Sequence, residues 1–240
     1  TIGDHAFSRC TSLETVDFPP GMERLQYHAF DGCVNLANID LSACEAMRVL
    51  GDGVFCNCSA LRTVIFPPRL ETVGSFALAG CALSTVNLSS CPNLRRIERG
   101  AFSHCTALRM VVFPVGLEVL GDSVLSACPK LAACNLTQCH ALRDIGAEAF
   151  SRCDALKVAC FPSSLETVGK GAFSECPELV QPNLTACRAL RTVGDGAFKS
   201  ADRGFFSRRR TNVATAPARN GTPKSTHQHT AEEARCCTCM

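Results

Sequence analysis

The chain has no tryptophan, a single tyrosine among its 240 residues, and a net charge of only +2. A net charge so close to zero does not indicate a strongly charged partner, and we expect no nucleic-acid partner. No stretch approaches the roughly 18 to 20 consecutive apolar residues of a transmembrane helix. Glycine-rich phosphate loops, His-Glu-x-x-His and Gly-x-Ser-x-Gly are also missing. We therefore expect no enzyme, no cofactor, no metal site and no small-molecule substrate.

A secretory signal peptide is absent as well, but the chain starts at Thr1, without methionine and inside a repeat. We therefore expect the true N-terminus, with any targeting signal, to lie upstream.

What the chain has in abundance is an internal repeat. An aromatic residue or leucine, followed three positions later by cysteine, returns at spacings of 23 to 25 residues. Odd units read Leu-x-x-Val-x-Phe-Pro, as at 13–19 and 61–67. Even units read Leu-x-x-Ile/Val-x-Leu-Ser-x-Cys-x-x-Leu/Met, as at 36–47 and 83–94. The period is therefore a pair of units, 47 or 48 residues long. Eight such pairs occur, each with a phenylalanine or leucine first and a cysteine second: Phe7/Cys10, Phe30/Cys33, Phe55/Cys58, Leu78/Cys81, Phe102/Cys105, Leu125/Cys128, Phe150/Cys153 and Phe173/Cys176.

The pattern within a unit predicts its local structure. Apolar positions that alternate with polar ones in Leu-x-x-Val-x-Phe predict a short strand with one buried face. Such a unit has no way to bury its own apolar side, so the units must stack in register. The spacing of three in x-x-Ala-Phe-x-x-Cys predicts one or two helical turns. The glycine at 51, 74, 121, 146, 169 and 194 predicts a positive φ or a close backbone approach.

Over residues 1 to about 200, this composite motif resembles the BspA-like, or Treponema-type, leucine-rich repeats, whose unit is similar to I-G-x-x-A-F-x-x-C-x-x-L-x-x-V-x-F-P. The resemblance implies a repeat solenoid, a right-handed coil with parallel short strands on its concave face and turns or short helical segments on its convex side. The two alternating kinds of unit are similar to versions found in protozoan parasites such as kinetoplastids. Members of the family are thought of as surface adhesins or as intracellular interaction scaffolds.

The predicted solenoid spans 1–206, with eight units of 23–25 residues and a degenerate end unit. Residues 207–240 lack apolar periodicity and are rich in Arg, Thr, Ala and Pro, which predicts a disordered basic tail. The tail ends in Cys237-Thr-Cys-Met, which matches the C-a-a-X signal for farnesylation of Cys237, although Thr is not aliphatic. A lipid there, helped by the basic residues, would tether the solenoid to a membrane surface.

Twelve of the 18 cysteines hold fixed repeat positions: the eight above, and Cys44, Cys91, Cys139 and Cys187. The favoured interpretation is a ladder of small, buried, reduced side chains, which favours a reducing compartment. A disulfide framework is the second interpretation. Metal binding is the third, although no cysteine pair of the ladder has the spacing of a zinc knuckle and no histidine recurs beside it.

The polar strand positions should line the concave face, where we expect a protein partner of unknown identity to bind. Several of these positions hold apolar residues framed by cations, which is typical of a docking site. The alternative is that scattered apolar surface residues are ordinary. Asn87 also belongs to a glycosylation sequon, Asn87-Leu-Ser. The predicted partner-binding residues are Arg62, Ile65, Asn87, Arg109, Met110, Val112, Lys157 and Val158.

The leading functional hypothesis is a non-catalytic protein-protein interaction scaffold, located in the cytoplasm or on the cytosolic membrane face. A secreted or cell-surface adhesin or antigen is the first alternative, which glycosylation and disulfides would favour. A regulatory repeat domain of a longer protein is the second.

Overall fold

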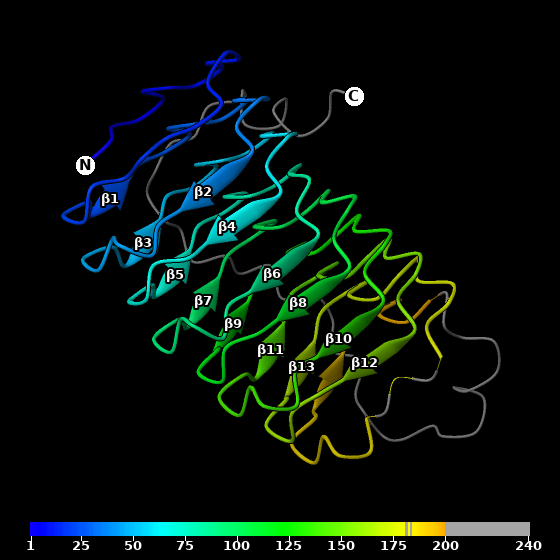
Figure 1. The fold of residues 1–240 in the computed structure, drawn as a ribbon. Coiled ribbons are helices and arrows are strands. Elements are labelled where there is room, and N and C mark those ends of the chain that lie inside the picture. The colour runs from blue at the N-terminus through cyan, green and yellow to red at the C-terminus, as the bar shows by residue number, and fades with distance from the viewer. Residues whose placement is uncertain (181, 183, 200–240) are drawn as a thin grey trace.

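The structure, a computed structural model, describes residues 1–180, 182 and 184–199. Over these residues the chain is a parallel β-solenoid that contains strands and turns but no helix (Figure 1). Every unit contributes one turn of the coil, so equivalent residues of consecutive units lie side by side. The predicted solenoid architecture is confirmed for the described part of the chain. Cys237 and the predicted tail lie outside it.

One continuous sheet runs the length of the coil, with its eight strands in sequence order. Leu25 pairs with Leu50 and Ile97 with Leu120, so each strand lies beside its equivalent in the next unit. Sequence analysis missed this sheet because two-residue strands are too short to show alternation. The strands are β1 (Arg24–Leu25), β3 (Val49–Leu50), β5 (Thr72–Val73), β7 (Arg96–Ile97), β9 (Val119–Leu120), β11 (Asp144–Ile145), β13 (Thr167–Val168) and β14 (Thr192–Val193).

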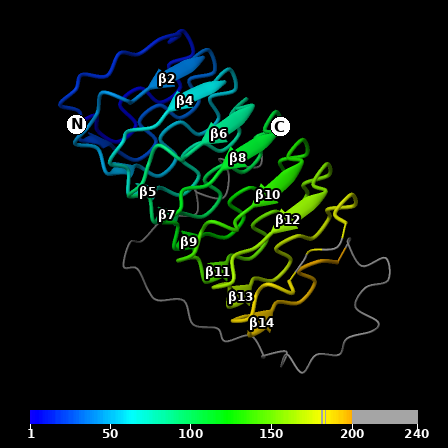
Figure 2. The ribbon, with the colours of Figure 1, turned by 60° about the horizontal axis from the view of Figure 1, so that its bottom comes forward.

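A second row of longer strands occupies another side of the coil (Figure 2). These are the strands that the x-Val-x pattern predicts, and their central side chains point inward, as Ile39 and Val86 do. They pair only two by two, as β2–β4, β6–β8 and β10–β12. The strands are β2 (Asn38–Asp40), β4 (Thr63–Ile65), β6 (Thr85–Asn87), β8 (Met110–Val112), β10 (Ala133–Asn135) and β12 (Val158–Cys160).

The pairing in this row follows the two kinds of unit. Each hydrogen-bonded pair joins an even unit to the odd unit after it, and no ladder joins β4 to β6 within the described residues. Even units leave the strand through a side-chain turn, in which the Ser42 N–H donates to the Asp40 carboxylate at 2.9 Å. Odd units leave through Phe-Pro, and proline has no N–H to donate. The two-unit period of the sequence is therefore also a period of strand pairing.

The short helical segments predicted for the convex side are wrong. In Gln26 to Cys33, alternate N–H groups donate to the next unit instead of to a carbonyl four residues back, as from Phe30 N to Val54 O at 2.8 Å. The residues at both ends of the Ala-Phe turn have positive φ, 50° at His28 and 69° at Gly32, which no right-handed helix accepts. A spacing of three apolar residues is common to this turn and to a helix, so sequence alone does not separate them.

The recurring glycines serve close approach and not positive φ. A β-carbon at Gly146 would lie 2.4 Å from the Gly121 carbonyl carbon, and one at Gly169 would lie 2.5 Å from the Gly146 carbonyl carbon. Real β-carbons are never this close to a neighbouring backbone, so a side chain there would push two units apart. The positive φ angles instead fall later in the turn, at residues such as Gly53 and Gly100.

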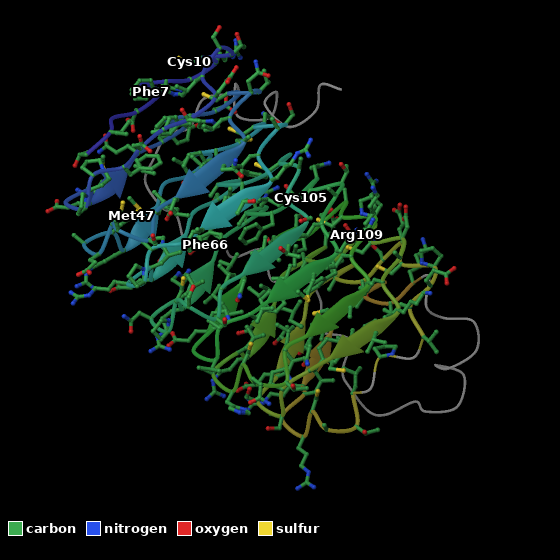
Figure 3. All side chains as sticks on the ribbon, in the orientation of Figure 1. Phe7, Cys10, Met47, Phe66, Cys105 and Arg109 are labelled. Carbon is green, nitrogen blue, oxygen red and sulfur yellow. The ribbon has the colours of Figure 1, made fainter. Side chains whose placement is uncertain are left out.

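The core is a set of columns in which each side chain lies on its equivalent in the next unit. Phe30 stacks on Phe55 with ring centroids 5.4 Å apart, and Phe150 stacks on Phe173 at 4.9 Å. The Phe-Pro phenylalanines of the odd units turn inward as well, and Phe66 is buried inside the coil (Figure 3). These columns bury the apolar half of every unit, which supplies the main driving force for stacking.

The cysteine ladder is buried as predicted except at Cys10, which is exposed in the first unit. The buried thiols also donate hydrogen bonds between units. The Cys58 thiol lies 3.2 Å from the Phe30 carbonyl oxygen, and the Cys105 thiol lies 3.3 Å from that of Leu78. The second cysteine series does the same with proline carbonyls, as from Cys91 to Pro67 at 3.5 Å. Cysteine is small enough for the column and, unlike alanine or valine, carries a weak donor. The described cysteines form no disulfide.

Burial of these thiols makes alkaline pH destabilising. It raises the pKa of Cys105 from 9.0 to about 12 and that of Cys139 to about 11. The folded protein therefore keeps these protons while the unfolded chain loses them. The stabilisation is complete below pH 9 and is lost as pH rises toward 11 to 12, at about 1.4 kcal/mol per pH unit for each thiol.

Urea unfolding between pH 8 and 11 should therefore give a free energy of unfolding that falls steeply above pH 9. Cys105→Ala should be less stable than the parent at pH 8. Its free energy of unfolding should nevertheless fall less per pH unit, because one buried thiol no longer contributes. Equal slopes for the parent and Cys105→Ala would contradict this account.

Candidate interaction surface

The surface predicted to bind a partner is formed by the longer strands. The strands β2, β4, β6, β8, β10 and β12 form one row along the coil (Figure 2). We define the three-residue-strand face as the outward side chains of these strands, together with the residue before each strand. Two outward positions per strand flank the buried central one, as in the exposed–buried–exposed pattern of β6. Side chains at equivalent positions form rows that run along the coil.

All eight predicted partner-binding residues lie on this face. Seven of them are exposed and Val112 is half-buried. The apolar side chains stand out most, because Ile65, Met110 and Val158 expose 47%, 52% and 50% of their surface. Arg109 projects from the same side of the coil (Figure 3). Whether a partner binds there stays a prediction.

Asn87 differs from the other seven because its side chain already has a structural task. Its carbonyl oxygen accepts the Ser89 N–H at 3.0 Å and the Ser89 hydroxyl at 2.7 Å. Asn135 and Thr137 repeat the arrangement. The polar residue that ends each even-unit strand therefore shapes the turn, and the same pattern makes Asn135-Leu-Thr a second sequon.

Odd and even units present different side chains on this face. Odd units carry large ones: Arg62 and Ile65 at β4, and Met110 at β8. Even units carry small ones, such as Ser84 before β6 and Ala132 before β10. The face is therefore a series of ridges, one at every second unit. A cation directly precedes an apolar side chain at Arg109–Met110 and Lys157–Val158, whereas Thr63 separates Arg62 from the strand's apolar residues.

The cations on the ridges have no acidic partner in the described part of the chain. No ion pair there involves Arg62, Arg109 or Lys157, and all three are exposed. The acidic residue of this face, Asp40, lies at its N-terminal end, on β2. Hydrogen bonds from Ser42 lower the pKa of the Asp40 carboxyl group, so this end stays negative at neutral pH.

The eight-stranded sheet carries the opposite arrangement, a ladder of matched charges that sequence analysis missed. The residue just before each strand alternates between glutamate and arginine without exception. Glu71 pairs with Arg48, Arg95 with Glu118 at 3.7 Å, and Glu166 with both Arg143 and Arg191. The signal was present in the sequence, but it appears only when the units are aligned in pairs. The ladder consists of Glu23, Arg48, Glu71, Arg95, Glu118, Arg143, Glu166 and Arg191.

Few other features of the described residues suggest chemistry. A shallow hollow is lined by Arg48, Glu71, Asn93 and Arg95, so it belongs to the charge ladder. No group of three or more His, Cys, Asp or Glu side chains is placed to hold a metal ion within the described ranges. Those ranges also hold no helix long and apolar enough to cross a membrane.

These features define a leucine-rich-repeat solenoid with an exposed strand face. The profile of the BspA type leucine rich repeat region, in six copies, matches residues 1–93 and 88–203. Because the matches cover most of the chain, the protein belongs to the BspA-type leucine-rich-repeat family. A comparison with curated protein sequences gives no match.

One solved structure shares the fold, and a second is similar in sequence. A leucine-rich repeat protein from Bacteroides ovatus is 21% identical over 83% of this chain and 67% of its own, with a TM-score of 0.65. The T. pallidum leucine rich repeat protein, TpLRR, is 25% identical over 72% of this chain and 63% of its own, with a TM-score of 0.46. The first likeness shows a common fold. The chain spans about two thirds of the length of these proteins.

The charge ladder predicts that a reversed rung destabilises the coil. Arg95→Glu would place a carboxylate between Glu71 and Glu118, whose backbones bond directly to that of residue 95. We expect a loss of about 1 kcal/mol in the free energy of unfolding, because the rungs are exposed and water screens them.

Chemical denaturation of Arg95→Glu, with Arg95→Gln as the uncharged control, measures this loss. The glutamine variant should lose less, and high salt should narrow the gap between the two. If both variants have the same stability at low salt, the alternation has no energetic role.

Proposed function

We propose that this protein is a non-catalytic interaction scaffold that binds a protein partner on its three-residue-strand face. The observation that carries the proposal is the set of half-exposed apolar side chains at Ile65, Met110 and Val158. Fully burying such a side chain contributes about 1.5 to 3 kcal/mol, so covering the exposed half of each would give about 1 kcal/mol. The membership of the BspA-type family supports a binding role.

Charge supports the same face. The four ladder arginines each have a glutamate partner, as Arg48 has Glu71, whereas Arg62, Arg109 and Lys157 have no acidic partner in the described chain. Unpaired cations next to apolar side chains are the mixture found at protein interfaces, where they steer association and fix register.

A cytoplasmic location is part of the proposal. The many buried cysteines without a disulfide in the described residues favour a reducing compartment. The secreted or cell-surface adhesin and the regulatory repeat domain of a longer protein stay as alternative hypotheses. The exposed sequon at Asn87 supports the adhesin, but the role of Asn87 in its turn already accounts for that residue. The protozoan origin stays a prediction that the alternation of unit types supports.

The face is tested by a photo-crosslinking amino acid at Ala133, an exposed position between two ridges. A crosslinked partner is identified, purified and titrated against the unmodified protein. Val158→Asp should then weaken binding at least about tenfold, because a carboxylate in an apolar contact costs more than about 1.4 kcal/mol.

Val49→Asp is the matched control, because Val49 exposes 48% against 50% for Val158 and lies in β3 of the other sheet. It should change the affinity less than about twofold. If Val49→Asp weakens binding as much as Val158→Asp does, the partner does not use the proposed face.

We further propose that the tail tethers the scaffold to a membrane through a farnesyl group on Cys237. The C-a-a-X ending and the adjacent Cys236, a second acylation candidate, support this. An N-terminally tagged chain with a free C-terminus should pellet with membranes and gain the mass of a prenyl group. Cys237→Ser should be soluble and unmodified. A parent chain that is soluble and unmodified would refute the tether.

A further inference from the structure

Large and small outward side chains alternate from strand to strand on the three-residue-strand face. The cations Arg62, Arg109 and Lys157 directly precede the odd-unit strands β4, β8 and β12, whereas Ser84 and Ala132 hold the same position in the even units between them. The half-exposed apolar side chains of the face also belong to odd units. Strands with small side chains therefore flank each ridge, so the face fits a second face of the same kind that is shifted by one unit.

The charge of the face changes sign along the coil. Among the described residues that form it, Asp40 on β2 is the one acidic side chain, and the three cations follow toward β12. The row of strands from β2 to β12 is nearly straight in both views (Figure 1 and Figure 2). A second copy that runs in the opposite direction can therefore lie along the whole row, with its negative end at the positive end of the first.

We propose that the partner of this face is a second copy of the chain, and that two copies form an antiparallel dimer through their three-residue-strand faces. A two-fold axis parallel to the strands passes between β6 and β8, so that β2 of each copy faces β12 of the other, β4 faces β10, and β6 faces β8. Every contact then occurs twice, as a two-fold interface requires. This inference rests on the proposed function and identifies its partner.

In this arrangement each odd-unit strand lies on an even-unit strand, and large side chains are opposite small ones. Arg62 of one copy is opposite Ala132 of the other, and Met110 is opposite Thr85. The acidic strand β2 lies over β12, which a lysine directly precedes. The ridges of one copy therefore lie between those of the other, and no cation of the face is directly opposite another cation.

The fit of the two faces does not depend on the distances between the strands. Hydrogen bonds join β2 to β4, β6 to β8 and β10 to β12, and the steps between these pairs have no ladder within the described residues. In the proposed register the pair β2–β4 faces the pair β10–β12, and β6–β8 faces its own copy. Paired steps thus meet paired steps, and the step from β4 to β6 meets the equivalent step from β8 to β10. The two-fold axis alone matches their spacing.

A shift of one unit in either direction removes this fit. It places odd units on odd units, so that Arg62 faces Arg109 in one direction and Lys157 in the other. Like charges that face each other across an interface are unfavourable, and the large side chains then meet at the ridges. The proposed register is the one that uses all six strands and separates all the cations.

The size of the face sets the expected affinity. Each of the six strands contributes two outward residues and the residue before it, which gives eighteen residues per copy. A standard interface has about 20 to 30 residues on each side, so this one is small. We expect a reversible dimer with a dissociation constant of about 1 to 100 µM.

Sedimentation velocity of the full chain over a concentration series measures the dimer, with a reducing agent present so that no intermolecular disulfide forms. The sedimentation coefficient should rise with concentration from that of a monomer to that of a dimer. A chain that is still monomeric at about 100 µM would overturn the inference.

Three variants test the register. Ala132→Arg should weaken dimerisation at least about tenfold, because the new arginine faces Arg62 of the other copy. Arg62→Ala/Ala132→Arg should restore most of the affinity, because it exchanges the large and the small residue between two opposing strands. Ala141→Arg is the matched control, since Ala141 is also exposed but lies in the turn after β10. It should change the affinity less than about twofold.

Crosslinking locates the contact directly. A photo-crosslinking amino acid at Ala133, in a mixture of copies with and without heavy nitrogen, should join residue 133 of one copy to residues 62–65 of the other, because β10 faces β4. The same amino acid at Val49, on the eight-stranded sheet, should give no crosslink between copies.

Crosslinks from residue 133 to 37–40 or 84–87 would show a register shifted by one unit and would overturn the inference. Equal losses in Ala132→Arg and Ala141→Arg, or a double variant as weak as Ala132→Arg, would also overturn it. The proposed function survives each of these results, because it fails only if a purified partner is insensitive to Val158→Asp.

Discussion

The fold depends on one constraint: no unit of this chain can satisfy its own backbone or bury its own apolar side. The turn around Ala29 and Phe30 shows this, because its alternate N–H groups donate to carbonyls of the next unit, as from His28 to Asp52. The aromatic and cysteine columns follow from the same stacking, since a residue repeated in sequence becomes a residue stacked in space. The absence of a β-carbon at Gly146 or Gly169 is what allows the backbones to approach closely enough. Each unit is therefore stabilised by contacts with its neighbours rather than by contacts within itself.

The structural repeat is a pair of units, for two independent physical reasons. On the eight-stranded sheet, glutamate and arginine alternate, so a coil that joined two odd units would bring Glu71 next to another glutamate. In the row of longer strands, even and odd units leave their strands through different turns, and only the even-to-odd step pairs fully. The ridges of the three-residue-strand face inherit the same period, because only odd units carry the large side chains. The periodic surface is thus a consequence of the way in which the coil is held together.

Sequence was sufficient for the architecture and for the outward strand positions, because burial imposes a pattern that stacking repeats eight times. Prediction from the sequence failed where one pattern is compatible with two different structures. The spacing of Ala29, Phe30 and Cys33 suits a helix, yet the positive φ at His28 and Gly32 makes a turn. The two-residue strands, such as β5 at Thr72–Val73, are too short for alternation to reveal them. The predicted binding residues all lie on one face, as their strand positions require. The turn formed by Asn87 and the pairing of Arg48 with Glu71 depend on neighbours that only the fold brings together.

The claim that the repeat is a pair of units is tested most directly by deleting whole units and measuring the free energy of unfolding. Removal of residues 81–127 joins Gly80 to Cys128 and takes out one complete pair, so glutamate still meets arginine and each strand keeps its kind of neighbour. Removal of 81–104 joins Gly80 to Cys105, takes out one unit, and stacks two odd units together. We predict that the shorter, pair-deleted protein is the more stable of the two. If the protein that lacks a single unit is more stable, as its greater length alone would suggest, then the units are interchangeable and the two-unit period has no structural meaning.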